Sequence, residues 1–277
     1  MRDSIDKSAH IHHYQRHATY SYPVRLSQRI HATVTLPVIL LIITILAVRF
    51  FPVPQSNSST LDWHLVIFSL LSTLYRLLIA YAFALVISIP IALLINVNAL
   101  TERLLLPFFD IVQSVPVLAF FPVIIALFLH YGFVNAAAVF IIFLSMLWNL
   151  VFSLVGGLRI IPSDIRAAAQ VFNIRQLAYL RKIILPAIFP YIVTGSLLAW
   201  AQGWNIIIVA EVLHTYIPGG GSNLDAYGIG SLLVHASASG QSQIFLASIT
   251  VMVIMIGLIN FFIWQRLLRL AERFRFE

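Results

Sequence analysis

Long apolar runs constrain the fold of this sequence more than any other feature. Residues 69–97, 133–158 and 243–268 each exceed the roughly 20 residues that cross the hydrocarbon core of a bilayer as a helix. Lipid offers no partners to backbone N–H and C=O groups, so such segments must satisfy them internally. Only 10% of the residues are charged, whereas about a quarter are charged in soluble domains. The sequence therefore predicts an all-α integral membrane protein.

Six transmembrane helices are predicted. The first covers residues 33–51, between a polar N-terminal tail at 1–32 and a core of five helices within 66–265. The five lie at about 69–97, 104–130, 133–158, 187–213 and 243–268, and residues 266–277 form a C-terminal tail. Pro116 and Pro122 interrupt the helix at 104–130. Because each proline leaves the carbonyl four residues earlier without its donor, we expect a kink or break there.

The positive charges of the sequence lie in loops and tails. Fifteen of the 17 Lys and Arg residues fall in four segments, at 1–32, 98–103, 159–182 and 266–277. Basic loops stay on the cytoplasmic side of a membrane, so both termini are expected in the cytoplasm. The segment at 214–241, which is rich in glycine and is interpreted as an outer loop, carries no Lys or Arg. Anionic membrane lipid accounts for the net charge of +7, and no nucleic-acid partner is expected.

The most polar interior segment, IPSDIRAAAQVFNIRQLAYLRKIILPAIFP at 161–190, has the signals of a short helix. Ser163 can cap a helix start, and Asp164 would place its charge in the first turn, at the positive end of the helix dipole. The three alanines at 167–169 favour helix and carry little bulk. Asn173 follows at the point where a residue in the left-handed conformation ends many helices. A short helix with a small face on a basic loop suits insertion into a cleft of another protein.

A second helical stretch is predicted from about 174 to 185, ended by Pro186 and Pro190. The spacing across the whole segment resembles the EAA loop of type-I ABC importer permeases. Ala167, Ala168 and Ala169 stand at its Glu-Ala-Ala triplet, Asn173 at its glycine, and Ile183, Leu185 and Pro186 at its Ile-x-Leu-Pro. The sequence departs from the pattern at two positions, because Ala167 replaces the glutamate and Asn173 replaces the glycine.

Two further segments, DIVQSVPVLAFFPVIIALF and GWNIIIVAEVL, resemble permeases of the nitrate, sulfonate and taurine branch of this family. Over about residues 66–265 the resemblance implies the five-helix core of a type-I importer permease in a bacterial inner membrane. It implies import of a small anion together with two ATPase subunits, a periplasmic or lipid-anchored solute-binding protein and a second permease subunit, identical or similar. It assigns ATPase coupling to the loop at 159–186, and there to Ser163, Asp164, Ala167, Ala168, Ala169, Asn173 and Pro186.

No nucleotide or metal chemistry is expected of this chain itself. The GGGS at 219–222 lacks the Gly-Lys-Ser/Thr of a phosphate-binding loop, so ATP is expected on the partner ATPase and no cofactor is predicted here. A group of histidines in the N-terminal tail has no carboxylate or Cys beside it to set a metal geometry, and no metal site is predicted. These are His10, His12, His13 and His17.

Two other function classes are weighed against the importer subunit. A stand-alone secondary transporter or channel would favour inverted repeats and an ion site near the membrane midplane, and neither is plain in the sequence. A membrane-embedded enzyme would need a cluster of reactive side chains within the spans. The remaining histidines are too widely spread along the sequence to form such a cluster. They are His64, His130, His214 and His235.

Polar residues within the predicted spans mark a candidate translocation path. Asp110, Gln113 and Ser114 form one stripe at positions i, i+3 and i+4 of a helix. Such groups face the bundle interior or a water-filled path, and interhelical hydrogen bonding is the alternative role. Further candidates for the path are Asn149, Gln202 and Asn205.

A stripe of small residues is predicted to serve close helix packing. Gly195, Ala199 and Gly203 recur every four residues, so they share one face of the helix at 187–213. Small residues at this spacing let a neighbouring helix approach closely in a membrane.

Arg76 and Glu211 are charged residues in the outer halves of their predicted spans. Two ordinary roles are open to them: their side chains can extend to the membrane surface, or they can form an ion pair with each other. The third alternative is that Arg76 guides an anion along the path. The sequence alone leaves these three roles open.

Overall fold

The computed structural model describes residues 61–274, apart from 97, 129–130, 175, 217–220 and 222–223. All regular structure in this part of the chain is helical. Four helical stretches are long and apolar enough to cross a membrane, namely Trp63–Ile95, Val134–Arg159, Leu180–Glu211 and Ser242–Phe274. The predicted helix at 33–51 and the tail at 1–32 lie outside the described residues, so a total of six spans stays a prediction.

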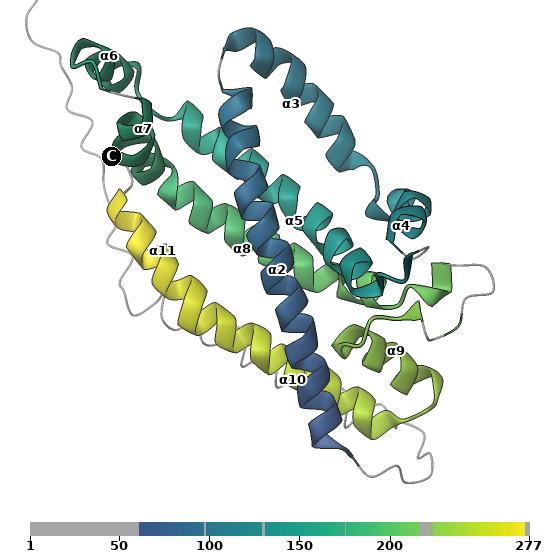
Figure 1. The fold of residues 1–277 in the computed structure, drawn as a ribbon. Coiled ribbons are helices and arrows are strands. Elements are labelled where there is room, and N and C mark those ends of the chain that lie inside the picture. The colour runs from purple at the N-terminus through teal and green to yellow at the C-terminus, as the bar shows by residue number, and fades with distance from the viewer. Residues whose placement is uncertain are drawn as a thin grey trace, which may run out of the picture.

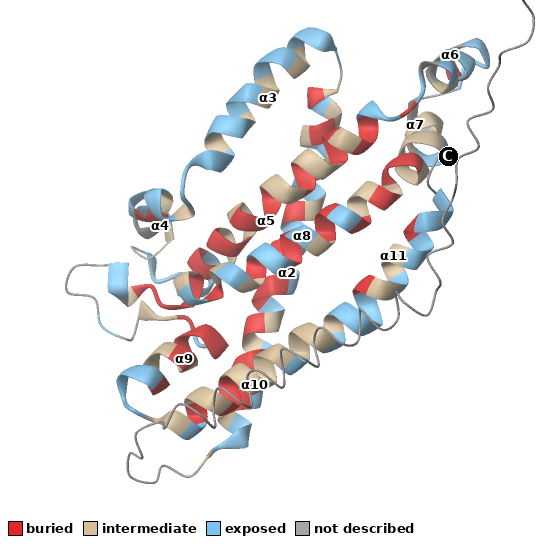
Figure 2. Ribbon diagram, turned by 180° about the vertical axis from the view of Figure 1, so that it is seen from behind, coloured by how far each residue is buried: buried red, intermediate tan, exposed pale blue. Residues whose placement is uncertain are grey.

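Three helices form the centre of the bundle: α2 (Trp63–Ile95), α5 (Val134–Arg159) and α8 (Leu185–Glu211). They lie side by side in Figure 1, and Figure 2 shows many buried residues along them. Apolar side chains from all three, among them Leu77 and Ile207, are fully buried in one cluster. Because lipid is as apolar as these side chains, close packing rather than exclusion of water holds the three helices together.

Small residues let α5 and α8 approach closely. A Cβ atom added to Gly195 would lie 2.6 Å from the Cβ of Ser153 on α5, and one added to Gly203 would lie 2.1 Å from the Cε of Met146. Ala199, between the two glycines, is fully buried. Carbon atoms do not approach this closely without bonding. The predicted packing role of this stripe is therefore confirmed.

The chain breaks at Pro116, as predicted. α3 (Ala99–Ser114) ends before this proline, and the 3-10 turn η1 (Val117–Phe120) leads into α4 (Phe121–Phe128). The two halves are bent by 90°, and together they are apolar enough to count as a fifth span. Pro122 lies in the first turn of α4, where a helix has no hydrogen bond to lose.

α3 stands apart from the central bundle (Figure 1), and none of its residues is buried. Its apolar side chains Leu104, Phe108 and Ile111 are largely exposed. An ion pair between Glu102 and Arg159 links the first turn of α3 to the end of α5. Partly exposed pairs of this kind contribute only about 0–1 kcal/mol, so apolar contacts hold α3 more than this pair does. Leu105, Leu106 and Phe109 of α3 pack against the apolar cluster at that end of the bundle.

Two short helices, α6 (Ser163–Val171) and α7 (Gln176–Tyr179), lie beyond one end of the bundle, named here the α6 end. The prediction that Pro186 and Pro190 end the second helical stretch is wrong. A π-helical turn, η3 (Leu180–Ile184), joins α7 directly to α8. Pro186 is tolerated because it lies in the first turn of α8. Pro190 removes one hydrogen bond, and the packing of α8 against α5 holds the helix together around it.

A helix that the sequence did not predict lies at the opposite end of the bundle, named the α9 end. α9 (Ile229–Ala238) falls within the segment 214–241 that was interpreted as a loop, after the 3-10 turn η4 (His214–Tyr216). The many glycines of that segment suggested a loop, and Gly228 and Gly230 are two of them. Their contacts with α8, described below, are the reason that a helix forms instead.

The last part of the chain returns from the α9 end to the α6 end (Figure 1). It consists of α10 (Ser242–Ile259), the π-helical turn η6 (Asn260–Trp264), α11 (Gln265–Ala271) and the 3-10 turn η7 (Glu272–Phe274). Trp264 is buried against Trp200 of α8, and the ring centroids are 6.2 Å apart. The basic segment that follows Trp264 therefore lies at the same end as α6.

The close approach of α5 and α8 predicts different costs for two glycines. Gly195→Ala should destabilise the chain by about 1–3 kcal/mol, because the new methyl group meets Ser153 and the core must shift. Gly156→Ala is the matched control, because a Cβ atom there meets nothing within 4 Å. Thermal unfolding in detergent measures both. Equal unfolding temperatures for the two variants would contradict the packing role.

Candidate coupling surface and buried charge network

α6 ends as its sequence predicts. Asn173 has a φ of +47°, in the left-handed region, and among the described residues it is the one non-glycine residue with positive φ. The N–H of Ile174 donates to the carbonyl of Ala169 at 3.0 Å, and the N–H of Phe172 donates to the carbonyl of Ala168 at 3.0 Å. The first of these is the six-to-one bond of the Schellman motif, which satisfies a carbonyl at the helix end. Asparagine thus does here what glycine usually does.

The two faces of α6 differ. Ile165 packs against the apolar cluster at the α6 end of the bundle, and Ala169 is buried. On the other side Ala167 and Ala168 are exposed, and so are Val171 and Phe172, at 82% and 77%. Large apolar side chains at this exposure form a surface suited to contact with another protein.

The remaining predicted coupling residues lie near α6 or at its start. Asp164 is exposed in the first turn, as predicted. The predicted capping role of Ser163 stays a prediction. Pro186 lies in the first turn of α8 and faces the same cavity as Ile165. The structure therefore brings the predicted coupling residues to one end of the bundle.

A buried ion pair joins α2 to the end of α8. The Nη1 atom of Arg76 lies 2.7 Å from Oε1 of Glu211. The hydroxyl of Thr73, one turn before Arg76, donates to the same oxygen at 2.6 Å. The side chain of Arg76 is 4% exposed and that of Glu211 is 0% exposed. The ion pair that the sequence left as one of three roles is therefore formed, and neither charge extends to the surface.

Glu211 also caps α9, although it lies far from it in the sequence. Its Oε2 atom accepts hydrogen bonds from the backbone N–H of Gly230 at 2.7 Å and of Ser231 at 3.4 Å. These residues occupy the second and third positions of α9, where N–H groups have no partner within the helix. The N–H of Ile229 donates to the Thr73 hydroxyl at 2.9 Å. The positive end of α9 thus meets a negative charge, which stabilises the helix.

Two glycines make this contact possible. A Cβ atom on Gly228 would lie 2.2 Å from Oε1 of Glu211, and one on Gly230 would lie 2.9 Å from Oε2. A side chain at either position would displace the carboxylate. The glycines that suggested a loop therefore serve the approach of a carboxylate to a helix start.

Arg76 uses all three of its nitrogen atoms within the protein. Nε donates to Oδ1 of Asn135 on α5 at 3.1 Å. Nη2 donates to the hydroxyl of Ser72 at 3.4 Å and to the carbonyl of Tyr227. The network therefore ties α2, α5, α8 and the start of α9 together. In this arrangement no guanidinium nitrogen is left without a partner, and a role of Arg76 in guiding an anion stays a prediction.

A second carboxylate fastens the other end of α9, and sequence reasoning missed it. Asp225 is 4% exposed and accepts from the His214 backbone N–H at 3.0 Å. Its Oδ2 atom lies 2.7 Å from Nδ1 of His214 and 2.9 Å from Nε2 of His235, in the last turn of α9. The spacing of these residues fits no helix or strand period, so the sequence carried no signal of their meeting. Among the described residues no group of three or more such side chains is arranged to hold a metal ion.

The other candidate path residues lie away from this network. Asp110, Gln113 and Ser114 are exposed on α3, where Gln113 donates to Asp110 Oδ1 at 2.7 Å and Ser114 donates to the Asp110 carbonyl at 2.8 Å. Asn149 is partly buried on α5, and Gln202 and Asn205 are exposed on α8. No hydrogen bond among the described residues joins any of them to Arg76 or Glu211. Their assignment to a translocation path stays a prediction.

Residues 84–273 match the family described as binding-protein-dependent transport system inner membrane component. The chain belongs to this family. The match includes the broken third span, α6 and the final helix, and it confirms the resemblance to type-I ABC importer permeases. The four helical stretches that are long and apolar enough to cross a membrane agree with the inner membrane component that the family name describes.

Relatives in this family carry names of small-anion transport. The chain is 34% identical over 160 residues to a nitrate import permease protein of Leptolyngbya laminosa, covering 58% of this chain and 56% of the relative. It is 32% identical over 158 residues to a bicarbonate transport system permease protein of Synechococcus elongatus, covering 57% and 56%. A taurine transport system permease protein of Escherichia coli is 22% identical over 191 residues, covering 69% and 65%. The alignment thus spans little more than half the length of the first two relatives.

The buried ion pair predicts that its members depend on each other. Arg76→Gln or Glu211→Gln alone should destabilise the permease by about 3–5 kcal/mol, because each leaves an uncompensated charge in a low dielectric. The double variant should recover much of that loss, because no charge then remains buried alone. Thermal unfolding in detergent gives the three values.

Glu102→Gln is the matched control for this cycle, because it removes one partner of a partly exposed pair and should cost less than about 1 kcal/mol. Independent, additive losses in the double variant would show that the two charges do not act as a pair. Loss of anion uptake in Arg76→Gln at unchanged stability would instead identify Arg76 as a guide for the solute.

Proposed function

We propose that this chain is the permease subunit of an ATP-driven ABC importer for a small anion. The match to the binding-protein-dependent transport family over residues 84–273 carries the proposal, together with the anion-transport names of its relatives. Nitrate, bicarbonate and taurine are the solutes to test first. ATP is bound and hydrolysed by a separate ATPase subunit, and a solute-binding protein and a second permease subunit complete the assembly.

The α6 helix is the proposed docking element for the ATPase. Its exposed face combines two small side chains, Ala167 and Ala168, with the large apolar Val171, and the exposed Phe172 follows directly after the helix. Its opposite face contacts the bundle through Ile165. A helix closed at its end by the Asn173 turn can move as one body when the ATPase subunits close. The membrane helices would then shift between outward and inward openings.

The proposed membrane orientation places the α6 end in the cytoplasm. The described Lys and Arg residues support it, because Arg76 alone lies outside the segments at 98–103, 159–182 and 266–274. Both termini would then be cytoplasmic, and the predicted helix at 33–51 would bring the number of spans to six. The permease domain would cover about 66–265, and the α9 end would face the solute-binding protein.

The proposed function predicts that uptake depends on ATP and on small side chains at the exposed face of α6. Vesicles containing the permease, its ATPase and its binding protein should accumulate labelled nitrate, bicarbonate or taurine only when ATP is present on the ATPase side. Ala168→Arg adds bulk and charge to the exposed face and should reduce the uptake rate at least ten-fold. A ten-fold loss corresponds to about 1.4 kcal/mol of binding free energy between α6 and the ATPase. The measurement is initial uptake rate together with the amount of ATPase bound.

Ala168→Ser is the matched control, because it keeps the side chain small and uncharged and should leave uptake near that of the unchanged protein. Normal assembly and uptake in Ala168→Arg would remove α6 as the docking element. Uptake driven by an ion gradient without ATP would contradict the importer function altogether.

The orientation predicts where fused reporters are active. Green fluorescent protein fused after Asn173 or Arg273 should be fluorescent, because both positions are expected in the cytoplasm. Alkaline phosphatase should be active after Gly240, in the turn between α9 and α10, because it requires the outer compartment. Phosphatase activity after Asn173 would place α6 away from ATP and would exclude the proposed coupling.

A further inference from the structure

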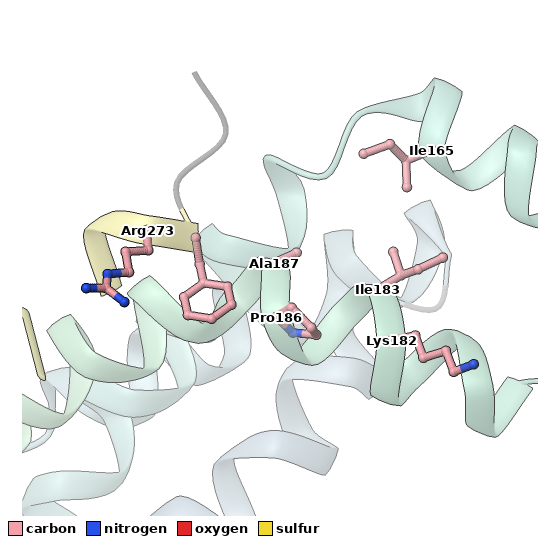
Figure 3. A pocket seen from close by; sticks show the side chains of 7 residues that line it. Ile165, Lys182, Ile183, Pro186, Ala187 and Arg273 are labelled. Carbon is pink, nitrogen blue, oxygen red and sulfur yellow. The ribbon is translucent and has the colours of Figure 1, made fainter. Parts of the chain in front are cut away.

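A cavity of about 380 Å³ opens at the α6 end, and the function proposed above assigns no ligand to it. Four elements form it, namely α6, the consecutive η3 and first turn of α8, and η7 from the far end of the chain (Figure 3). The residues that line it are Ile165, Lys182, Ile183, Pro186, Ala187, Arg273 and Phe274. Five of the seven are apolar and two are cations.

The apolar wall is formed by well-held residues. Phe274 packs edge-on against Phe189 of α8, with ring centroids 5.3 Å apart. Ala187 is buried, and Ile183 and Pro186 are partly buried. Lys182 and Arg273 are exposed, and Figure 3 shows them on opposite sides of the apolar residues. The cavity therefore offers an apolar surface between two positive charges.

The depth of the cavity in the membrane follows from the helices that form it. The apolar stretch Leu180–Glu211 begins at this cavity, and the apolar stretch Ser242–Phe274 ends at it. A spanning helix leaves the hydrocarbon near its ends, where lipid headgroups lie. Lys182 and Arg273 stand at the ends of these stretches, so they would lie at or just beyond headgroup level, with the apolar wall toward the acyl chains.

We propose that this cavity binds an anionic phospholipid. Its phosphate would contact Lys182 or Arg273, and an acyl chain would cover the wall formed by Ile183, Pro186 and Phe274. Basic pockets between transmembrane helices on the cytoplasmic side bind anionic headgroups in this way. A free phosphate ion would leave the apolar wall in contact with water, so an amphiphilic occupant fits the lining better.

The bound lipid would also contact α6. Ile165 belongs to α6, whereas the other lining residues belong to η3, α8 and η7. One occupant would therefore bridge the proposed docking element, the start of a span and the end of the final helix. Lipid binding at this cavity does not depend on which solute the chain transports, so the two can be tested separately.

Lipid titration of the full-length permease in detergent, followed by native mass spectrometry, tests the proposal. Phosphatidylglycerol should bind more tightly than phosphatidylcholine. Lys182→Gln combined with Arg273→Gln should weaken phosphatidylglycerol binding by about thirty-fold, because each cation near a membrane surface contributes about a factor of five. Both side chains are exposed, so the double variant should fold, and its unfolding temperature without lipid checks this.

Arg266→Gln combined with Arg269→Gln is the matched control. It removes the same charge from exposed positions of α11 that do not line the cavity, and it should leave binding nearly unchanged. An equal loss in both pairs would mean attraction to general surface charge and would overturn the proposal. Equal binding of the two lipids would overturn it as well.

Glycerol phosphate, which has the charged group without acyl chains, separates a lipid site from a free-phosphate site. The proposal expects it to bind far more weakly than phosphatidylglycerol. Phe274→Ser should then weaken phosphatidylglycerol binding and leave glycerol phosphate unaffected. Glycerol phosphate binding as tightly as the lipid, with no effect of Phe274→Ser on either, would overturn the lipid assignment.

Discussion

The carboxylate of Glu211 is the group on which the α9 end of this membrane protein depends. It is fully buried, and it receives hydrogen bonds from Thr73 and Arg76 of α2 and from the first N–H groups of α9. A charge taken out of water is costly unless its partners are complete. Here one partner is a cation and the others are a hydroxyl and a helix start, so the charge fixes the relative positions of α2, α8 and α9. Asp225 adds a second fastening through His235 at the far end of α9.

The α6 end is held by apolar packing and backbone hydrogen bonds, whereas the α9 end is held by buried charges. The contact shown between α6 and the bundle is the packing of Ile165 against an apolar cluster, and Ala169 of α6 is buried. Its end is set by backbone hydrogen bonds around Asn173. Apolar contacts have no preferred direction, whereas charged hydrogen bonds do. The chain thus has one end fastened by directional charged bonds and another where α6 rests on apolar packing, and the proposed coupling would use the second.

Much of the fold follows from local patterns. The apolar runs predicted four of the described spans, with ends that differ from the observed ones by up to seven residues, and Pro116 predicted the break between α3 and α4. Gly195 and Gly203 predicted close packing from their spacing alone. Local rules failed where tertiary packing overrode them. Pro186 and Pro190 do not end the helix, since a π-helical turn and the packing against α5 carry it through.

The sequence by itself determined the class of structure, the positions of the spans, the α6 helix and its left-handed end, because each depends on residues within one or two turns. Only the tertiary structure decided the α9 end. Glu211 caps a helix that begins 18 residues later, and Arg76 reaches it from a helix 135 residues away. A capping bond made through space leaves no periodic signal, so the glycines at 228 and 230 suggested a loop. Whether this segment forms a helix is decided by burial. The carboxylate of Glu211 binds Arg76 and the first N–H groups of α9 strongly only after the bundle has excluded water around them.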